Sequence, residues 1–319
     1  MKKEDIQTLA EGIKSGNRVS LSRAITLAES SLEEHQKLAH ELIQELISFT
    51  GKSKRIAITG VPGVGKSTFI ESFGKLLTQN GYKVAVLAID PSSSLSGGSI
   101  LGDKTRMEDL ARNPDAYIRP SATGGHLGGV ASRTYESVLL CEAAGFDVIL
   151  IETVGVGQSE TLVNDITDIF IFLQIPGAGD ELQGIKRGIM EMADLIFVNK
   201  VDDFGIDKAK DVKVTLARSL QFLPQKPSGW KRKVLLGSGL NSKGLAEVWE
   251  LVQDYFDTVQ SNGYFTENRK RQDELRVVEY IKEQISNRVK NLYKENSHKD
   301  SELINPYLIA EKWVKENLK

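Results

Sequence analysis

The segment RIAITGVPGVGKS, residues 55–67, decides the fold of this 319-residue chain. An apolar run ends in a glycine-rich turn of the form GxxxxGK[ST], and the amphipathic sequence STFIESFGKLL overlaps its end. A strand, this turn and a helix in that order are the context that identifies a phosphate-binding P-loop. The residues expected to bind nucleotide here are Gly60, Val61, Pro62, Gly63, Val64, Gly65, Lys66, Ser67 and Thr68.

The residue types of this turn explain its chemistry. Glycines let the backbone turn tightly, so that successive N–H groups and the start of the helix face the phosphates. Lys66 is spaced to reach the β and γ phosphates, and the Ser67 hydroxyl to ligate magnesium. The competing interpretation is a glycine-rich turn that binds nothing, and the complete motif argues against it.

Short apolar runs alternate with amphipathic segments after Arg55, which predicts βαβ units. The expected strands are RIAIT, KVAVLAID, DVILIET, DIFIFLQI, LIFVN and KVLLG. We therefore expect an α/β fold, a P-loop GTPase parallel sheet with helices on both faces, plus N-terminal and C-terminal helical extensions. The expected parts are an N-terminal helical extension (1–50), the GTPase domain (51–260) and a C-terminal helical arm (261–319). The arm is expected because apolar residues from Leu275 to Leu292 repeat at helical spacing over about 40 Å, a length that suggests a partner surface.

A second motif indicates the base. Asn199, Lys200 and Asp202 form NKxD directly after the apolar run LIFV. Ligands of open α/β sheets bind at the carboxyl ends of strands, and an Asp carboxylate there can accept two hydrogen bonds from guanine, whereas adenine lacks that donor pair. The motif therefore predicts GTP. A further base loop is expected at Ser238, Gly239 and Leu240.

Three acidic residues are candidates for ligating magnesium or positioning the attacking water. Asp90 and Glu152 end expected strands, and Asp103 lies in a polar loop. Magnesium takes oxygen ligands in an octahedron, so Ser67 with one or two of these carboxylates, completed by water, is a suitable set. Asp90 as a helix cap and Asp103 as a turn residue are the structural alternatives. Lys66, Asp90 and Glu152 are expected to act in catalysis, and we expect no permanently bound cofactor.

The segment ETVGVGQSE, residues 152–160, stands where Ras-like GTPases carry DxxGQ. Glutamate replaces the aspartate, and no glutamine follows Gly155 directly. The side chain that normally orients the water is therefore missing, unless Gln158 substitutes for it. We expect slow hydrolysis that a partner accelerates, and a loop that responds to the γ phosphate through its glycines.

Composition excludes several classes of protein. Lys and Arg total 41 against 43 Asp and Glu, a net charge of −2, which disfavours nucleic acid as a partner. The single cysteine, Cys141, allows no internal disulfide and fits a reducing cytoplasm. The N-terminus has no signal-peptide core, and no apolar run is long enough to cross a bilayer. We expect a cytoplasmic protein with no membrane partner.

Taken together, these motifs resemble the methylmalonyl-CoA mutase-associated GTPases, the MeaB/ArgK family. The likeness extends from about residue 20 to the end of the nucleotide domain. It is carried by GVPGVGKST, DPSSSLSGGSILGDKTRM, RPSATGGHLGGVASRT, ETVGVGQSE, PGAGDELQGIKRGIME and NKVD. The resemblance implies a homodimer, with the C-terminal helical arm (261–319) as the dimerisation arm. It also implies that this GTPase escorts an adenosylcobalamin-dependent acyl-CoA mutase, gates its cofactor loading and protects it. One departure is Gly239, where the family usually has alanine.

The resemblance also implies switch segments within 119–133, 152–160 and 176–187. The switch residues expected from it are Gly155, Gln158, Asp180, Glu181, Gln183, Lys186 and Arg187. For those after Pro176, a helix N-terminus with acidic first-turn residues is an equally good explanation. Two other functions stay open. A P-loop kinase acting on a protein or small molecule is disfavoured by NKxD, and a nickel-insertion GTPase by four scattered His and one Cys.

Overall fold

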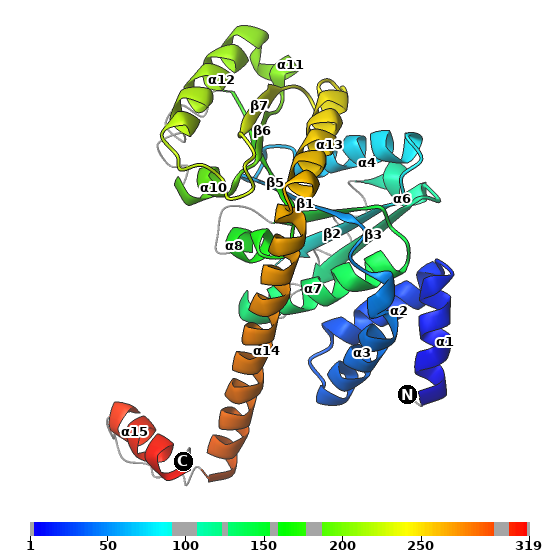
Figure 1. Ribbon diagram of the computed structural model, residues 1–319, viewed down its shortest axis with the longest axis vertical. Coiled ribbons are helices and arrows are strands. Elements are labelled where there is room, and N and C mark those ends of the chain that lie inside the picture. Colours follow the sequence, from blue (N-terminus) through cyan, green and yellow to red (C-terminus); the bar gives the residue numbers. More distant parts are fainter. Residues whose placement is uncertain are drawn as a thin grey trace. The chain divides into compact units, whose positions relative to one another are not determined.

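A computed structural model describes residues 3–90, 107–122, 127–153, 159–176, 187–296 and 306–317. Within these residues a seven-stranded sheet has the order β3-β2-β4-β1-β5-β6-β7, and every neighbouring pair is parallel. The strands are β1 Lys54–Gly60, β2 Val84–Asp90, β3 Ala116–Ala122, β4 Val148–Thr153, β5 Ile169–Gln174, β6 Leu195–Val198 and β7 Lys233–Leu236. The α/β fold class expected from the sequence is confirmed (Figure 1).

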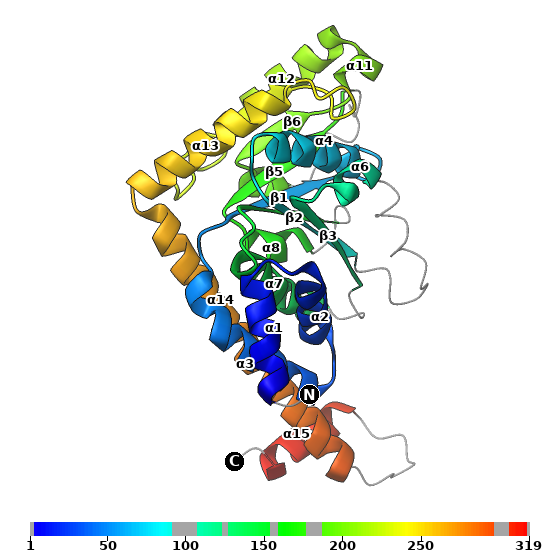
Figure 2. The same ribbon diagram turned by 90° about the vertical axis from the view of Figure 1, so that its right-hand side faces the viewer.

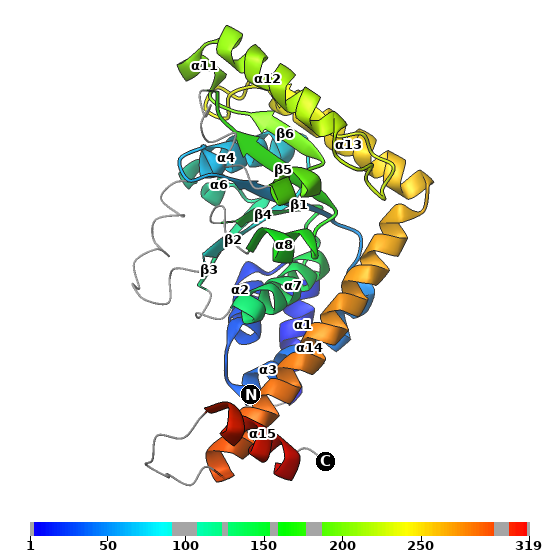
Figure 3. The ribbon, with the colours of Figure 1, turned by 90° about the vertical axis from the view of Figure 1, so that its left-hand side faces the viewer.

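Helices cover both faces of the sheet, because the central strands are apolar on both sides. One buried cluster joins the sheet to α4, α6 and α13, and the other joins it to α7, α8, α10, α12 and the N-terminal helices (Figures 1 and 3). The helices are α1 Lys3–Lys14, α2 Arg18–Glu29, α3 Glu33–Leu46, α4 Lys66–Gln79, α6 Glu108–Arg112, α7 Leu127–Ala143, α8 Ser159–Asn164, α10 Arg187–Met192, α11 Val201–Phe204, α12 Ile206–Gln221, α13 Leu245–Ser261, α14 Tyr264–Asn296 and α15 Pro306–Asn317, with a short 3-10 helix at Ile47–Phe49.

Strand β3 was missing from the sequence-based expectation. Its sequence, AYIRPSA, contains Pro120 and lacks a continuous apolar run. Proline has no N–H to donate, so it normally excludes a segment from the interior of a sheet. Here β3 pairs with β2 alone at the edge of the described sheet, where proline is tolerated.

The N-terminal extension consists of α1, α2 and α3, which pack against one another and against α7 (Figure 2). Asn17 caps α2, since its side-chain oxygen accepts from the N–H groups of Val19 and Ser20. Ile13, Leu21 and other apolar residues of this extension are fully buried in the same cluster as α7. The three helices are therefore part of the folded domain core.

The chain separates into two compact units, residues 1–272 and 273–319. Helix α14 confirms the long helix expected over about 267–293. In the second unit it leaves an apolar stripe half exposed, with 51% of Ile281 and 57% of Ile285 accessible. No helix in the described ranges combines the length and apolarity needed to span a bilayer.

A buried ionic network joins the start of α14 to the sheet. Glu142 of α7 accepts from Arg55 of β1 at 2.8 and 2.9 Å, and Arg269 of α14 pairs with Asp168 at 2.6 and 2.8 Å. Burial opposes the charge of Glu142, but Arg55 and Arg269 hold its pKa below the usual value. Removing one partner would leave a buried charge unpaired, at a cost of about 3–5 kcal/mol. Residues 264–272 therefore belong structurally to the nucleotide domain.

Candidate nucleotide-binding site

The expected P-loop lies between β1 and α4, at the carboxyl edge of the sheet. Gly65 precedes the first residue of α4 with φ 91°, in the left-handed region that favours glycine. A Cβ there would also lie 2.9 Å from Asn199 Nδ2. The backbone thus turns sharply into the helix, and the first turn of α4 presents its N–H groups at the loop.

Lys66 begins α4 and folds back over the turn. Its Nζ donates to the carbonyl oxygens of Gly60 at 2.9 Å and Val61 at 3.4 Å, and the residue is only 8% exposed. The ammonium group is therefore held against the P-loop backbone, within the turn expected to bind the phosphates.

Ser67, in the first turn of α4, meets Glu152 near the end of β4. The Ser67 hydroxyl donates to Glu152 Oε1 at 3.3 Å, and Glu152 pairs in register with Ile58 of β1. Asp90 ends β2, on the other side of β4. A hydroxyl and a carboxylate side by side are ligand types that magnesium prefers, so these residues fit the ion.

Asn199 links the P-loop to the base loop. Its amide nitrogen donates to the Val64 carbonyl at 2.8 Å, and its amide oxygen accepts from the Gly239 N–H at 2.8 Å. The side chain is 2% exposed. The two loops that the sequence predicted separately are therefore held together by one buried amide.

Asp202 is exposed and oriented by its neighbours. Asn241 Nδ2 donates to Asp202 Oδ2 at 2.9 Å. Hydrogen bonds from Ser238 first, and from Asn241, lower the pKa of Asp202 below its ordinary value. The carboxylate is thus ionised at neutral pH and available to a ligand with paired N–H donors.

The chain matches the family model of the methylmalonyl-CoA mutase-associated GTPase MeaB over residues 21–294. It belongs to the MeaB family. This family assignment makes the chain a P-loop GTPase, in agreement with its sheet and its NKxD loop.

Several characterised or solved proteins are similar to this MeaB-family GTPase. It is 46% identical over 287 residues to the GTPase ArgK of Escherichia coli K12, covering 89% of this chain and 86% of that protein. It is 42% identical over 290 residues to the mitochondrial methylmalonic aciduria type A homologue of Mus musculus, covering 88% and 70%. A crystal structure of an LAO/AO transport system kinase matches with a TM-score of 0.77 at 36% identity, covering 100% and 94%.

Asn241, a polar residue of the base loop, was not predicted from the sequence. Several residues that were predicted lie outside the described ranges. Asn241 follows the expected Ser238-Gly239-Leu240 loop, and only its bond to Asp202 reveals its importance. Lys200 is left-handed at φ 59°, which is uncommon for a residue other than glycine and concentrates at functional sites. Residues that lie outside the description, and whose roles stay predictions, are Asp103, Gly155, Gln158, Asp180, Glu181, Gln183 and Lys186.

Gly239, the departure from the family pattern, lies against α4. A Cβ there would be 3.0 Å from the Phe69 Cα and 3.1 Å from its backbone nitrogen. An alanine would require the helix or the loop to shift by a few tenths of an ångström. Glycine therefore permits this close approach and keeps the N–H that donates to Asn199.

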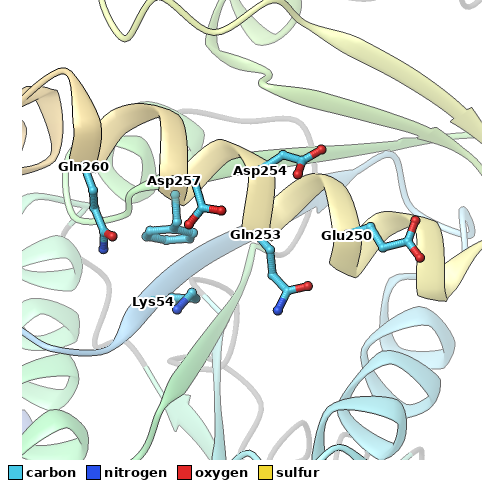
Figure 4. Close-up of a pocket in the computed structure, with 7 residues that line it drawn as sticks. Lys54, Glu250, Gln253, Asp254, Asp257 and Gln260 are labelled. Carbon is cyan, nitrogen blue, oxygen red and sulfur yellow. The ribbon is translucent and has the colours of Figure 1, made fainter.

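A surface groove lies elsewhere in the GTPase, between α13 and β1 (Figure 4). Its walls carry Glu250, Asp254 and Asp257, and the ammonium of Lys54 lies 5.2 Å from the centre of the Phe256 ring. Lys54 is the first residue of β1, whereas the P-loop follows the last. The groove is thus separate from the nucleotide site.

Proposed function

We propose that this chain binds Mg-GTP between the P-loop and the NKxD loop, and that hydrolysis to GDP and phosphate regulates an adenosylcobalamin-dependent acyl-CoA mutase of the methylmalonyl-CoA type. The observation that carries the nucleotide part is the Asn199 side chain, which bonds to the P-loop and to the base loop at once. The mutase part rests on the family and on the mouse relative named for methylmalonic aciduria.

Each of the described site residues has its own role in hydrolysis. Lys66 neutralises charge that develops on the β and γ phosphates, and the helix α4 N-terminus adds backbone N–H donors. Ser67 and Glu152, with Asp90 nearby, would hold magnesium, which supplies charge compensation at the phosphates when bound. Asp202 orients the base. No glutamine directly follows Gly155, so we propose slow intrinsic turnover that the partner accelerates.

The mutase partnership predicts nucleotide-dependent association. The chain loaded with a non-hydrolysable GTP analogue should retain an acyl-CoA mutase from the cytosol of its source, and retain it differently when loaded with GDP. Mass spectrometry of the eluate identifies the bound protein. Recovery of the same proteins with Lys66→Ala, which lacks the phosphate contact, would show that association is independent of nucleotide. Absence of any cobalamin-dependent mutase from all eluates would refute the chaperone proposal.

We propose that the chain is a homodimer through its C-terminal helices. The half-exposed stripe on α14 includes Val278, Ile281 and Ile285, which are spaced to share one helical face. Ile281→Asp with Ile285→Asp in the full chain should give a monomer in sedimentation velocity, because charge on this face opposes burial. Val214→Asp, an equally exposed apolar site on α12, is the control. A dimer that survives the double substitution would exclude this interface.

Two rival functions are weaker. A kinase would need an acceptor site and would transfer phosphate from ATP, whereas the oriented carboxylate of Asp202 suits guanine. A nickel-insertion GTPase would need a metal-binding cluster, and the described residues hold no group of three or more His, Cys, Asp or Glu that is suited to an ion. We therefore propose a cytoplasmic GTPase that acts on a mutase.

A further inference from the structure

A set of polar contacts ties helix α2 of the N-terminal extension to strand β3 and to helix α7. Glu29 ends α2, and its carboxylate pairs with the guanidinium of Arg119 on β3. The same guanidinium donates to Thr26 Oγ1 at 3.2 Å. From α7, Arg133 donates to the main-chain oxygen of Glu29 at 2.9 Å. We call these four residues the Glu29 clamp.

The paired side chains of the Glu29 clamp are largely shielded from solvent. The side chains of Arg119 and Glu29 are 21% and 16% exposed, so water competes weakly for their hydrogen bonds. Burial opposes the charge of Arg119, but the pairing with Glu29 outweighs it and raises the pKa of the guanidinium. Arg133 brings a positive charge to a carbonyl at the C-terminal end of α2, where the helix dipole favours cations.

Strand β3 runs beside β2 to the carboxyl edge of the sheet. Strand β3 ends at Ala122, which pairs in register with Asp90, a predicted magnesium ligand. Helix α7 begins at Leu127, so only four residues separate the two elements. Arg119 lies on the strand before this connection and Arg133 on the helix after it, and both bond to the same residue of α2. A shift of α2 would therefore displace both ends together.

We infer that Glu29 is a positioning residue for GTP hydrolysis, through which the N-terminal helices hold helix α7 and the end of β3, next to the predicted magnesium ligand Asp90 on β2. This inference rests on the nucleotide site proposed above and extends it to a helix that contributes no nucleotide contact. The N-terminal helices then contribute to turnover, in addition to packing against α7.

The test is a double-mutant cycle on kcat in the full chain, with Glu29→Gln, Arg119→Gln and the pair. Each single variant should lower kcat roughly tenfold, because small displacements near the reacting groups cost that much or more. The KM for GTP and the affinity for GDP should stay within about twofold, because the P-loop and NKxD loop are untouched. The double variant should be no slower than the slower single variant, as expected of residues that act as one unit.

Glu33→Gln is the matched control, since Glu33 pairs with Lys37 on the surface of α3 and touches no clamp residue. A parent-like kcat in Glu29→Gln would overturn the inference. So would rate losses that multiply in the double variant, or a loss of GDP affinity as large as the loss of kcat, which indicates general damage. If the parent chain fails to bind GDP at all, the proposed nucleotide site is at fault and not the clamp.

Discussion

Replacing Lys66 with alanine is expected to lower the rate of GTP hydrolysis by at least ~100-fold, the usual cost of removing one preorganised donor to developing charge. In the structure the Lys66 ammonium lies over the P-loop turn, held by the carbonyl oxygens of Gly60 and Val61. The other lysine of α4, Lys75, lies nine residues further along the helix and cannot replace it. An alanine side chain is too short to reach the phosphates.

Phosphate release under saturating GTP measures this effect. Lys75→Ala is the matched control, because Lys75 lies on the same helix and pairs with Asp109 at the surface. The control should turn over at the parent rate. Hydrolysis by Lys66→Ala at more than about a tenth of the parent rate would remove Lys66 from its proposed role.

Exchanging Asp202 for asparagine should transfer the preference from GTP to xanthosine triphosphate. A carboxylate at this position can accept hydrogen bonds from guanine N1–H and the exocyclic amine, whereas an amide presents a donor that matches the second carbonyl of xanthine. Each charged hydrogen bond contributes about 1.5–3 kcal/mol, so GTP affinity should fall at least ~100-fold. Nucleotide binding measured by calorimetry reports the exchange directly.

Asp203→Asn, at the adjacent exposed carboxylate, should leave the preference unchanged.

The pH dependence of guanine preference has a defined sign, because the pKa of Asp202 is lowered from its ordinary value of 3.8. The carboxylate stays charged as pH falls from 8 to about 5, so guanine preference should be constant there and decline only in stronger acid. Equal loss of GTP and XTP binding in Asp202→Asn would contradict base recognition by this residue.

Local sequence was sufficient for the sheet and the nucleotide loops because both depend on short, contiguous patterns. Apolar runs such as those of β4 and β5 are buried on both faces, and only strands between two helical layers need that composition. Strand β3 escaped detection because an edge strand can carry Pro120 and polar residues.

Contacts between distant residues could not be predicted from one sequence. Glu29 and Arg119 are 90 positions apart, and Glu142 and Arg269 are 127 apart. Charged residues of this kind are usually solvated, and no local pattern distinguishes the few that become buried partners. Asn241 was overlooked for the same reason, since its bond to Asp202 forms only when two loops meet.

The most direct measurement is displacement of a fluorescent GDP from the magnesium-loaded chain by unlabelled GDP and by unlabelled ADP. GDP should displace it at a concentration at least ~100-fold lower, because ADP offers no donor pair to Asp202 and leaves that carboxylate unmatched. Displacement by both nucleotides at similar concentrations, or binding of neither at millimolar levels, would contradict a guanine nucleotide held between the P-loop and the NKxD loop.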